Sequence, residues 1–329
     1  MPQPVFSLDF GEHTHLAPGK LLETVLAYQR ERRTGLLQIS SSGPGVLILV
    51  YVRGQLVTVY LCNDTVTRLD PSAWLESVLP TSPAISLRML ALTPQDLRLY
   101  KILVEQSGDK RISSNGNSNI DQQFTEWLQH PVLALARVRW REAGALVLFP
   151  GQGAQPEYSL VITPSQILHS TGGIQGVTSR TEALRALSLY SSEPGSPAWQ
   201  EYLLHQAFAG LVSGLLGKFE KLVGRMILNQ VVRDVNFKAA ANDWNVSLTA
   251  SSANDQALFS SPGQAAQAYT ALLDVILQQF ENVLGSAILA MLVREAILRL
   301  PGQVRQVISE FQLVGGLSVL DDRQVPTGA

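Results

Sequence analysis

Five histidines and one cysteine are the side chains of this chain best suited to acid–base, nucleophilic or metal chemistry. Glu12, His13 and His15 lie close enough in sequence to act as weak metal ligands, but a polar N-terminal loop explains the same residues. Cys62 ends an apolar run, which is typical of a buried small hydrophobe rather than a nucleophile. The remaining histidines are scattered. We therefore expect no metal site, no cofactor and no catalytic residue.

One glycine-rich segment resembles part of a known enzyme signature. Phe149-Pro150-Gly151-Gln152-Gly153 is similar to the N-terminal signature of malonyl-CoA:acyl-carrier-protein transacylases. Those enzymes also need a G-x-S-x-G turn that carries the nucleophile, and a downstream histidine that activates it. No G-x-S-x-G occurs in the chain. We predict a hairpin turn at Pro150-Gly151, and a protein that is not an enzyme.

The composition indicates a globular protein. The chain has 329 residues, 46% of them hydrophobic and 16% charged, and a net charge of −2. This length predicts about two domains. Nucleic-acid binding needs a concentrated basic face, so we expect no nucleic-acid partner. The longest uncharged apolar run, 283–293, is about half of the roughly 20 residues that a spanning helix needs. The N-terminus also lacks the pattern of a secretion signal. We expect a cytoplasmic protein with no membrane span.

The period of apolar residues predicts an α+β domain over residues 1–105. An amphipathic helix over 16–33 is followed by β-rich runs with Gly-bearing turns between them, which predicts an antiparallel meander. Thr93-Pro94 has the residues of a helix start. The expected elements after the first helix are strands at 35–39, 46–52 and 56–61, a helix near 71–78, a strand at 85–90 and a helix from 94.

The middle of the chain is harder to assign from its pattern. Residues 106–122 are polar and predict a linker or mobile loop. Residues 123–178 contain two strand-like regions, which either extend the first sheet or form a separate domain. Arg137, Arg139 and Arg141 alternate with apolar residues, which favours a solvated sheet face over a binding stripe.

Residues 179–312 predict a helical region, and residues 313–329 a loose tail. One helix is expected from 196 to about 236, with a bend or a close helix contact near Gly214 to Gly217. Another is expected over 265–300, before a break at Pro301-Gly302 and a last helix at 303–311.

This region contains an internal sequence repeat of one motif. Phe219 to Asp234 aligns without gaps to Phe280 to Glu295, so that every matched pair has the same sequence offset. Phe-Glu, a glycine, Ile-Leu and an Arg-acid pair recur in register. Because glycine is costly in a helix, we expect Gly224 and Gly285 to be points where helices cross closely. The simplest interpretation of the shared apolar stripe is core packing in a pseudo-symmetric helical hairpin or bundle. The alternative is a dimerisation face or an apolar ligand pocket. For that alternative the candidate interaction residues are Phe219, Gly224, Ile227, Arg233, Phe280, Gly285, Ile288 and Arg294.

Residues 19–104 resemble the PATAN domain, a module found at the N-terminus of PatA-type response regulators in cyanobacteria. The resemblance rests on Thr34-Gly35-Leu36-Leu37-Gln38-Ile39 and on the strand, glycine turn and returning strand over 48–57. It implies a bacterial regulatory module that works through protein–protein contacts. Thr58-Val59-Tyr60 departs from the family, which commonly has a small residue there.

Two functions follow from these patterns. The first is a bacterial signalling or assembly adaptor that binds an unidentified protein and forms a homodimer. The alternative is a sensor that holds an apolar small molecule between the repeated helices.

Overall fold

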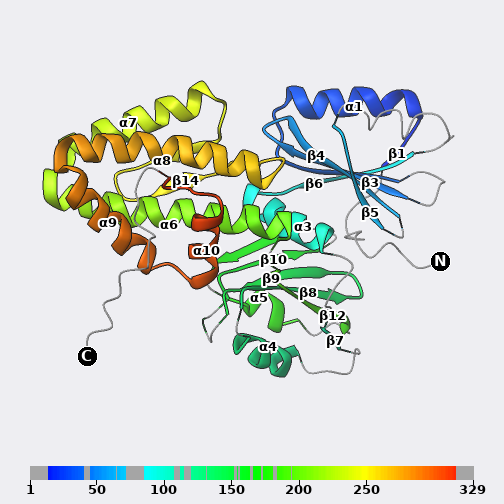
Figure 1. The fold of residues 1–329 in the computed structure, drawn as a ribbon. Helices are drawn as coiled ribbons and strands as arrows, with labels where there is room; N and C mark the ends of the chain where they lie inside the picture. The colour runs from blue at the N-terminus through cyan, green and yellow to red at the C-terminus, as the bar shows by residue number, and fades with distance from the viewer. Residues whose placement is uncertain are drawn as a thin grey trace. The chain divides into compact units, whose positions relative to one another are not determined.

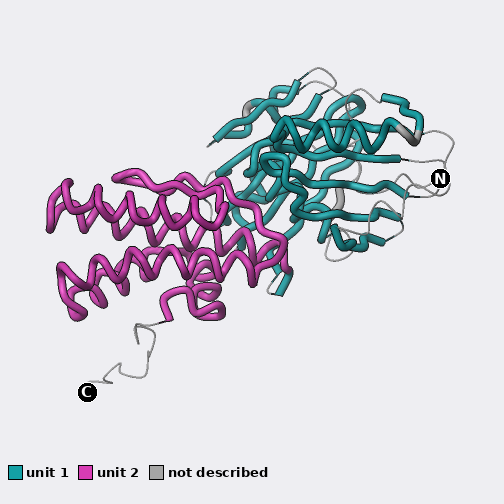
Figure 2. The backbone as a smooth tube through the Cα atoms, turned by 90° about the horizontal axis from the view of Figure 1, so that it is seen from above, with its two compact units in different colours: residues 1–196 teal, residues 197–329 magenta. Residues whose placement is uncertain are grey.

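The computed structural model divides the chain into two compact units, residues 1–196 and 197–329 (Figures 1 and 2). The first unit holds two six-stranded sheets and the second is mainly helical, which confirms the predicted α+β class. The helix expected near 71–78 and most of the expected tail lie outside the described residues. Those residues are 14–40, 45–63, 65–71, 85–106, 112–114, 120–130, 132–151, 154, 156–163, 166–171, 173–180, 184–193 and 195–315.

The first sheet contains the predicted meander. Its strand order is β1-β6-β2-β3-β4-β5, and every neighbouring pair is antiparallel. Helix α1 (Pro18–Arg30) covers one face, where Leu21, Val25 and Tyr28 join the core. The strands are β1 (Thr14–Leu16), β2 (Gly35–Ser40), β3 (Val46–Val52), β4 (Gln55–Cys62), β5 (Val66–Leu69) and β6 (Ile85–Ala91).

The second sheet does not extend the first, so that reading of residues 123–178 is wrong. Its order is β11-β10-β9-β8-β12-β7. Strand β7 (Ile112–Ser114) lies inside the expected linker, and β12 (Leu184–Ser191) lies inside the expected helical region. β12 forms because β8 pairs with its whole length. The other elements are α4 (Ile120–Leu128), β8 (Ala134–Trp140), β9 (Gly144–Phe149), β10 (Tyr158–Ile162), β11 (Ile167–Thr171) and α5 (Gln175–Thr178).

Both sheets are built by the same succession of elements. In each, a short edge strand and a helix precede four strands in a meander, and a fifth strand returns to pair with the first strand of the meander. The edge strand (β1 or β7) then pairs with the outer side of that fifth strand (β6 or β12). The first unit therefore contains one α/β module twice, a repeat that the sequence pattern did not reveal.

Helix α3 (Pro94–Glu105) contacts both sheets of the first unit. Thr93 and Asp96 form a capping box at its start, which confirms the predicted helix start. At its end, the Tyr60 hydroxyl of the first sheet donates to Glu105 at 2.5 Å, and the Gln106 side-chain amide donates to the Ser191 carbonyl of the second sheet at 3.3 Å. Every residue from 96 to 104 is buried.

The predicted arginine stripe is only partly solvated: Arg139 is half-buried, and Arg141, just after the end of β8, is exposed. Arg137 is only 6% exposed. Burial lowers the pKa of Arg137, and Tyr190 and Tyr100 oppose that shift. Strand alternation predicted that Arg137 and Arg139 share one face of β8, but it could not show that α3 lies against this sheet.

In the second unit, each expected long helix is divided in two by a glycine. The first is α6 (Pro197–Val223) and α7 (Arg225–Ala241), and the second is α8 (Pro262–Leu284) and α9 (Ser286–Leu298). A short hairpin, β13 (Val246–Leu248) and β14 (Ala253–Asp255), separates α7 from α8, and α10 (Gly302–Glu310) follows α9.

No bend occurs at Gly214 to Gly217, because α6 runs through them. The other expectation, close packing of α6 against a neighbouring segment, is met at Gly210 and Gly214. A Cβ on Gly210 would lie 2.5 Å from Leu300 Cδ2, and one on Gly214 would lie 3.4 Å from Ala296 Cβ.

Candidate functional site

The repeated motif in the second unit is also a repeat of structure. The rings of Phe219 and Phe280 stack with their centroids 3.5 Å apart and their planes 2° apart. The rings of Phe208 and Tyr269 stack at 4.7 Å and 17°. Both pairs have the sequence offset of the repeated motif. Since an antiparallel pair of helices cannot repeat the same offset, α6 and α8 lie parallel and in register (Figure 1).

The polar contacts follow the same symmetry. Lys218 of α6 forms an ion pair with Glu295 of α9. At the matching positions of the other repeat, the Gln279 side chain of α8 donates to Asp234 of α7 at 3.5 Å. The second helix of each repeat therefore contacts the first helix of the other repeat: α7 contacts α8, and α9 contacts α6. This is expected for an approximate two-fold axis between the repeats.

Gly224 and Gly285 form sharp elbows between the helices, and the prediction of close crossings at these glycines is wrong. Their backbone angles are nearly identical, with φ 85° and ψ 164° at Gly224 and φ 78° and ψ 158° at Gly285. A Cβ at either position would meet no other atom within 4 Å. The glycines are needed because side-chain-bearing residues strongly disfavour this conformation, not because another helix lies close.

Apolar side chains are exposed on both sides of these elbows. We call this set the elbow surface: Leu222 (57% exposed), Met226 (84%), Ile227 (36%), Val283 (45%), Ile288 (43%) and Met291 (60%). Leu222 matches Val283, and Ile227 matches Ile288, in the alignment of the two copies. Because α6 and α8 are parallel, both elbows lie at the same end of the second unit (Figure 1). Exposed apolar clusters of this kind are typical of docking sites.

The candidate interaction residues are therefore divided between core and surface. Phe219 and Phe280 are 0% exposed and hold the two repeats together, so they are not available to a partner in this fold. Ile227 and Ile288 belong to the elbow surface. Arg233 and Arg294 are exposed two turns further along α7 and α9. The motif comparison missed Leu222, Met226, Val283 and Met291, although apolar residues flanking a helix-breaking glycine could have indicated them.

The stacked rings of Phe219 and Phe280 argue against the alternative function, a sensor that holds an apolar molecule between the repeated helices. Rings 3.5 Å apart leave no space for a molecule between Phe219 and Phe280. The side chains of Ile227 and Ile288, expected to line the same cavity, are instead on the surface. These four residues do not enclose a site.

Two buried carboxylates each hold a histidine and a tyrosine. In the first unit, the Tyr158 hydroxyl donates to Asp96 Oδ1 at 2.7 Å, and His169 Nδ1 lies 3.2 Å from the same oxygen. Burial, followed by the Asp96 charge, raises the pKa of Tyr158 far above its ordinary value. Asp96 is thus a fixed acceptor that ties β10 and β11 to α3.

Asp255 has the same function in the second unit. Its Oδ2 accepts from the Tyr269 hydroxyl at 2.5 Å and lies 2.6 Å from His205 Nδ1, while its Oδ1 accepts from the Ala257 amide at 2.9 Å. The Asp255 side chain is 1% exposed. It ties the β13–β14 hairpin to α6 and α8, which is a structural role.

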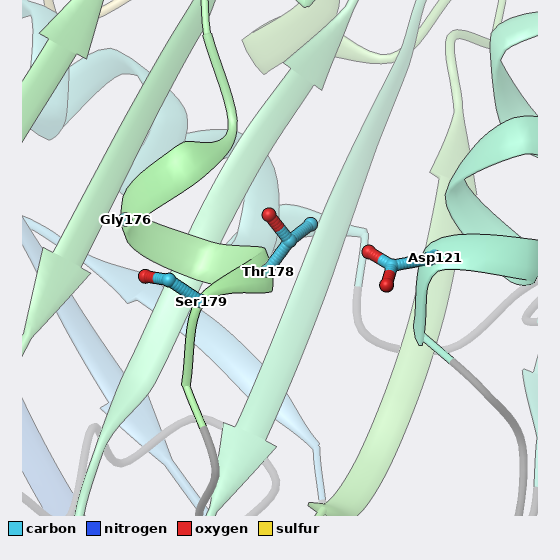
Figure 3. A pocket seen from close by; sticks show the side chains of 4 residues that line it. All are labelled: Asp121, Gly176, Thr178 and Ser179. Atoms are coloured by element: carbon cyan, nitrogen blue, oxygen red, sulfur yellow. The ribbon is translucent and has the colours of Figure 1, made fainter.

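A surface hollow and Cys62, two other candidate sites among the described residues, show no arrangement of groups suited to catalysis. An open hollow in the first unit is lined by Asp121, Gly176, Thr178 and Ser179 (Figure 3). The Thr178 hydroxyl already donates to the Ile174 carbonyl at 3.4 Å. Burial raises the pKa of Cys62 to about 12, so its thiol stays protonated at neutral pH. Within the described part of the chain, no cluster of three or more His, Cys, Asp or Glu could hold a metal.

Comparisons with known proteins add no relative. The chain matches no family model, no curated protein and no solved structure. None of the described helices is both long and apolar enough to cross a membrane.

Proposed function

We propose that this chain is a non-catalytic adaptor that acts through protein–protein contacts, with the elbow surface as its docking site. The observation that carries this proposal is the exposure of six large apolar side chains at two equivalent elbows. The resemblance of residues 19–104 to PATAN modules supports a role in bacterial signalling or assembly, in the cytoplasm. Self-association is part of the proposal.

The size of the elbow surface suggests the strength of the contact. Full burial of one such side chain contributes roughly 1.5–3 kcal/mol, and these side chains are already about half covered. A partner that covered all six would therefore gain on the order of 5–9 kcal/mol before the cost of association, itself about 4–15 kcal/mol. The elbow surface by itself favours a transient contact rather than a permanent one.

The test compares two sets of exposed apolar residues. Met226→Glu with Met291→Glu places charge in the elbow surface. Phe237→Glu places the same charge at an apolar residue of α7 that is 78% exposed but lies more than three turns beyond Gly224. Because a carboxylate is costly to desolvate, we expect the double variant to lose at least tenfold in association, and the Phe237 variant to lose little.

Association is measured by sedimentation of the purified protein and by quantitative capture of proteins from a lysate of the source organism. Thermal unfolding checks that both variants remain folded. If the elbow variant sediments and captures as the wild type does, or if Phe237→Glu is equally defective, the elbow surface is not the docking site.

A further inference from the structure

The elbow surface has an approximate two-fold symmetry that limits how two copies could meet on it. The repeats are related by an axis that runs along the parallel helices α6 and α8, since equivalent residues stack across it at two levels. The elbows of repeat 1 (Gly224) and repeat 2 (Gly285) therefore lie side by side at one end of the second unit.

Two copies can meet end to end on such a surface in two ways of nearly the same shape. Either each elbow faces the same elbow of the other copy, or the elbow of repeat 1 faces the elbow of repeat 2 in both directions. Both arrangements are closed dimers with a true two-fold axis. The apolar side chains do not discriminate between them, because Leu222 matches Val283 and Ile227 matches Ile288.

The charges beside the elbows do discriminate. Repeat 1 carries Lys221 and Arg225 beside Glu220, which gives an excess of one positive charge. At the equivalent positions, repeat 2 carries Asn282, Ser286 and Glu281, which gives one negative charge. Lys221, Arg225 and Glu281 are all exposed. Like-on-like docking would bring charges of the same sign together at both contacts, whereas crossed docking brings opposite charges together twice.

We propose that a second copy of this chain binds the elbow surface, with the elbow of repeat 1 against the elbow of repeat 2 in each direction. This inference rests on the proposed function, because it names one partner of the same surface. The crossed contact covers the six apolar side chains of both copies and places Lys221 and Arg225 of each copy near Glu281 of the other.

The test is cysteine cross-linking of the full chain at two equivalent positions. Met226→Cys marks repeat 1 and Ala287→Cys marks repeat 2; both positions are exposed, and the native Cys62 is buried. Two chains of different tagged mass, one with each substitution, are mixed and oxidised. We expect the mixture to give at least fivefold more cross-linked dimer than either chain alone.

Charge reversal provides a second readout. Glu281→Lys should weaken the dimer several-fold by sedimentation, and Lys221→Glu with Arg225→Glu should do the same. Mixing the two kinds of chain should restore the dimer, because both crossed contacts of the mixed dimer pair opposite charges. All three changes in one chain should also restore it, and only in the crossed arrangement, because like-on-like contacts would still pair charges of the same sign.

The outcomes separate this inference from the adaptor function. Stronger cross-linking of each chain with itself would overturn the crossed arrangement and keep self-association. A wild-type chain that sediments as a monomer up to high concentration, yet captures a different protein through the elbow surface, would overturn the second copy but not the adaptor. A monomer that instead binds phospholipid vesicles through the same residues would overturn both.

Discussion

Asp255 shows how much of the second unit depends on single polar residues. Its carboxylate accepts hydrogen bonds from the Tyr269 hydroxyl and the Ala257 amide and contacts His205, and it is almost fully buried. A buried donor that loses its acceptor costs about 1–3 kcal/mol. The strand residue Asp255 therefore holds β14, α6 and α8 to one another.

We predict that Asp255→Ala lowers the free energy of unfolding by about 3 kcal/mol, since at least two buried donors lose their acceptor. Asp274→Ala is the matched control, because Asp274 is exposed on α8 and its replacement should change stability by less than about 0.5 kcal/mol. Urea unfolding of the full chain measures both. Equal effects of the two substitutions would show that the buried carboxylate has no special role.

Phe219 and Phe280 illustrate what residue type and spacing can and cannot show. The recurrence of Phe in register correctly indicated a duplicated helix. Whether a recurrent Phe faces a partner or the other repeat depends on the packing of α6 against α8, which involves residues far apart in the sequence. The sequence therefore predicted the pair and favoured its packing in a core, but it could not show that the two rings stack on each other.

At the scale of helices, the elbow glycines explain why long helices were expected where the structure has hairpins. The apolar period continues across Gly224 and Gly285, and a glycine inside a helix costs only about 1 kcal/mol. The pattern therefore does not distinguish a tolerated helical glycine from one with positive φ. Gly210, Gly214 and Gly217 are of the first kind, since α6 continues through all three.

Alanine substitution distinguishes the two kinds of glycine. Gly224→Ala and Gly285→Ala should each destabilise the protein by about 1–3 kcal/mol, because φ near +80° is strained for alanine. Gly217→Ala should instead stabilise it by about 0.5–1 kcal/mol, because Gly217 lies in a helix and an added Cβ there meets nothing within 4 Å. Equilibrium unfolding in urea measures the sign. Stabilisation by Gly224→Ala would mean that the first elbow is not formed in solution.

For the molecule as a whole, the two α/β modules of the first unit share one helix. Helix α3 follows the last strand of the first sheet, yet Asp96 and Gln106 bond to the second sheet. Neither module is therefore complete without the other.

We predict that a chain shortened to residues 1–106 binds the apolar dye ANS and aggregates, because the side of α3 that faces the second sheet becomes exposed. A chain of residues 1–196 keeps both sheets and should unfold cooperatively. Size-exclusion chromatography and dye fluorescence compare the two. Cooperative unfolding of a monomeric 1–106 chain would show that the modules are independent.

The sequence predicted the first meander and the α3 capping box because these depend on nearby residues. It predicted the strand regions of β8, β9 and β10 but not β7 or β12, because β12 pairs with β8 and with β7, and the whole of β9, β10 and β11 lies between these partners in the chain. The elbow surface was predicted only in part: Ile227 and Ile288 followed from the repeat, whereas exposure of Met226 and Met291 depends on the elbows.

The rate of methionine oxidation tests most directly the claim that proteins dock on the elbow surface. The wild-type chain provides its own control, because it also carries an exposed methionine outside that surface. Met226 and Met291 are on the elbow surface, whereas Met89, which is 46% exposed, is on β6 of the first unit. We predict that oxidation of Met226 and Met291 by hydrogen peroxide, followed by mass spectrometry, slows several-fold when the protein is concentrated or when lysate from the source organism is added. Met89 should keep its rate. Unchanged oxidation of Met226 and Met291 under all these conditions would contradict the claim that proteins dock on the elbow surface.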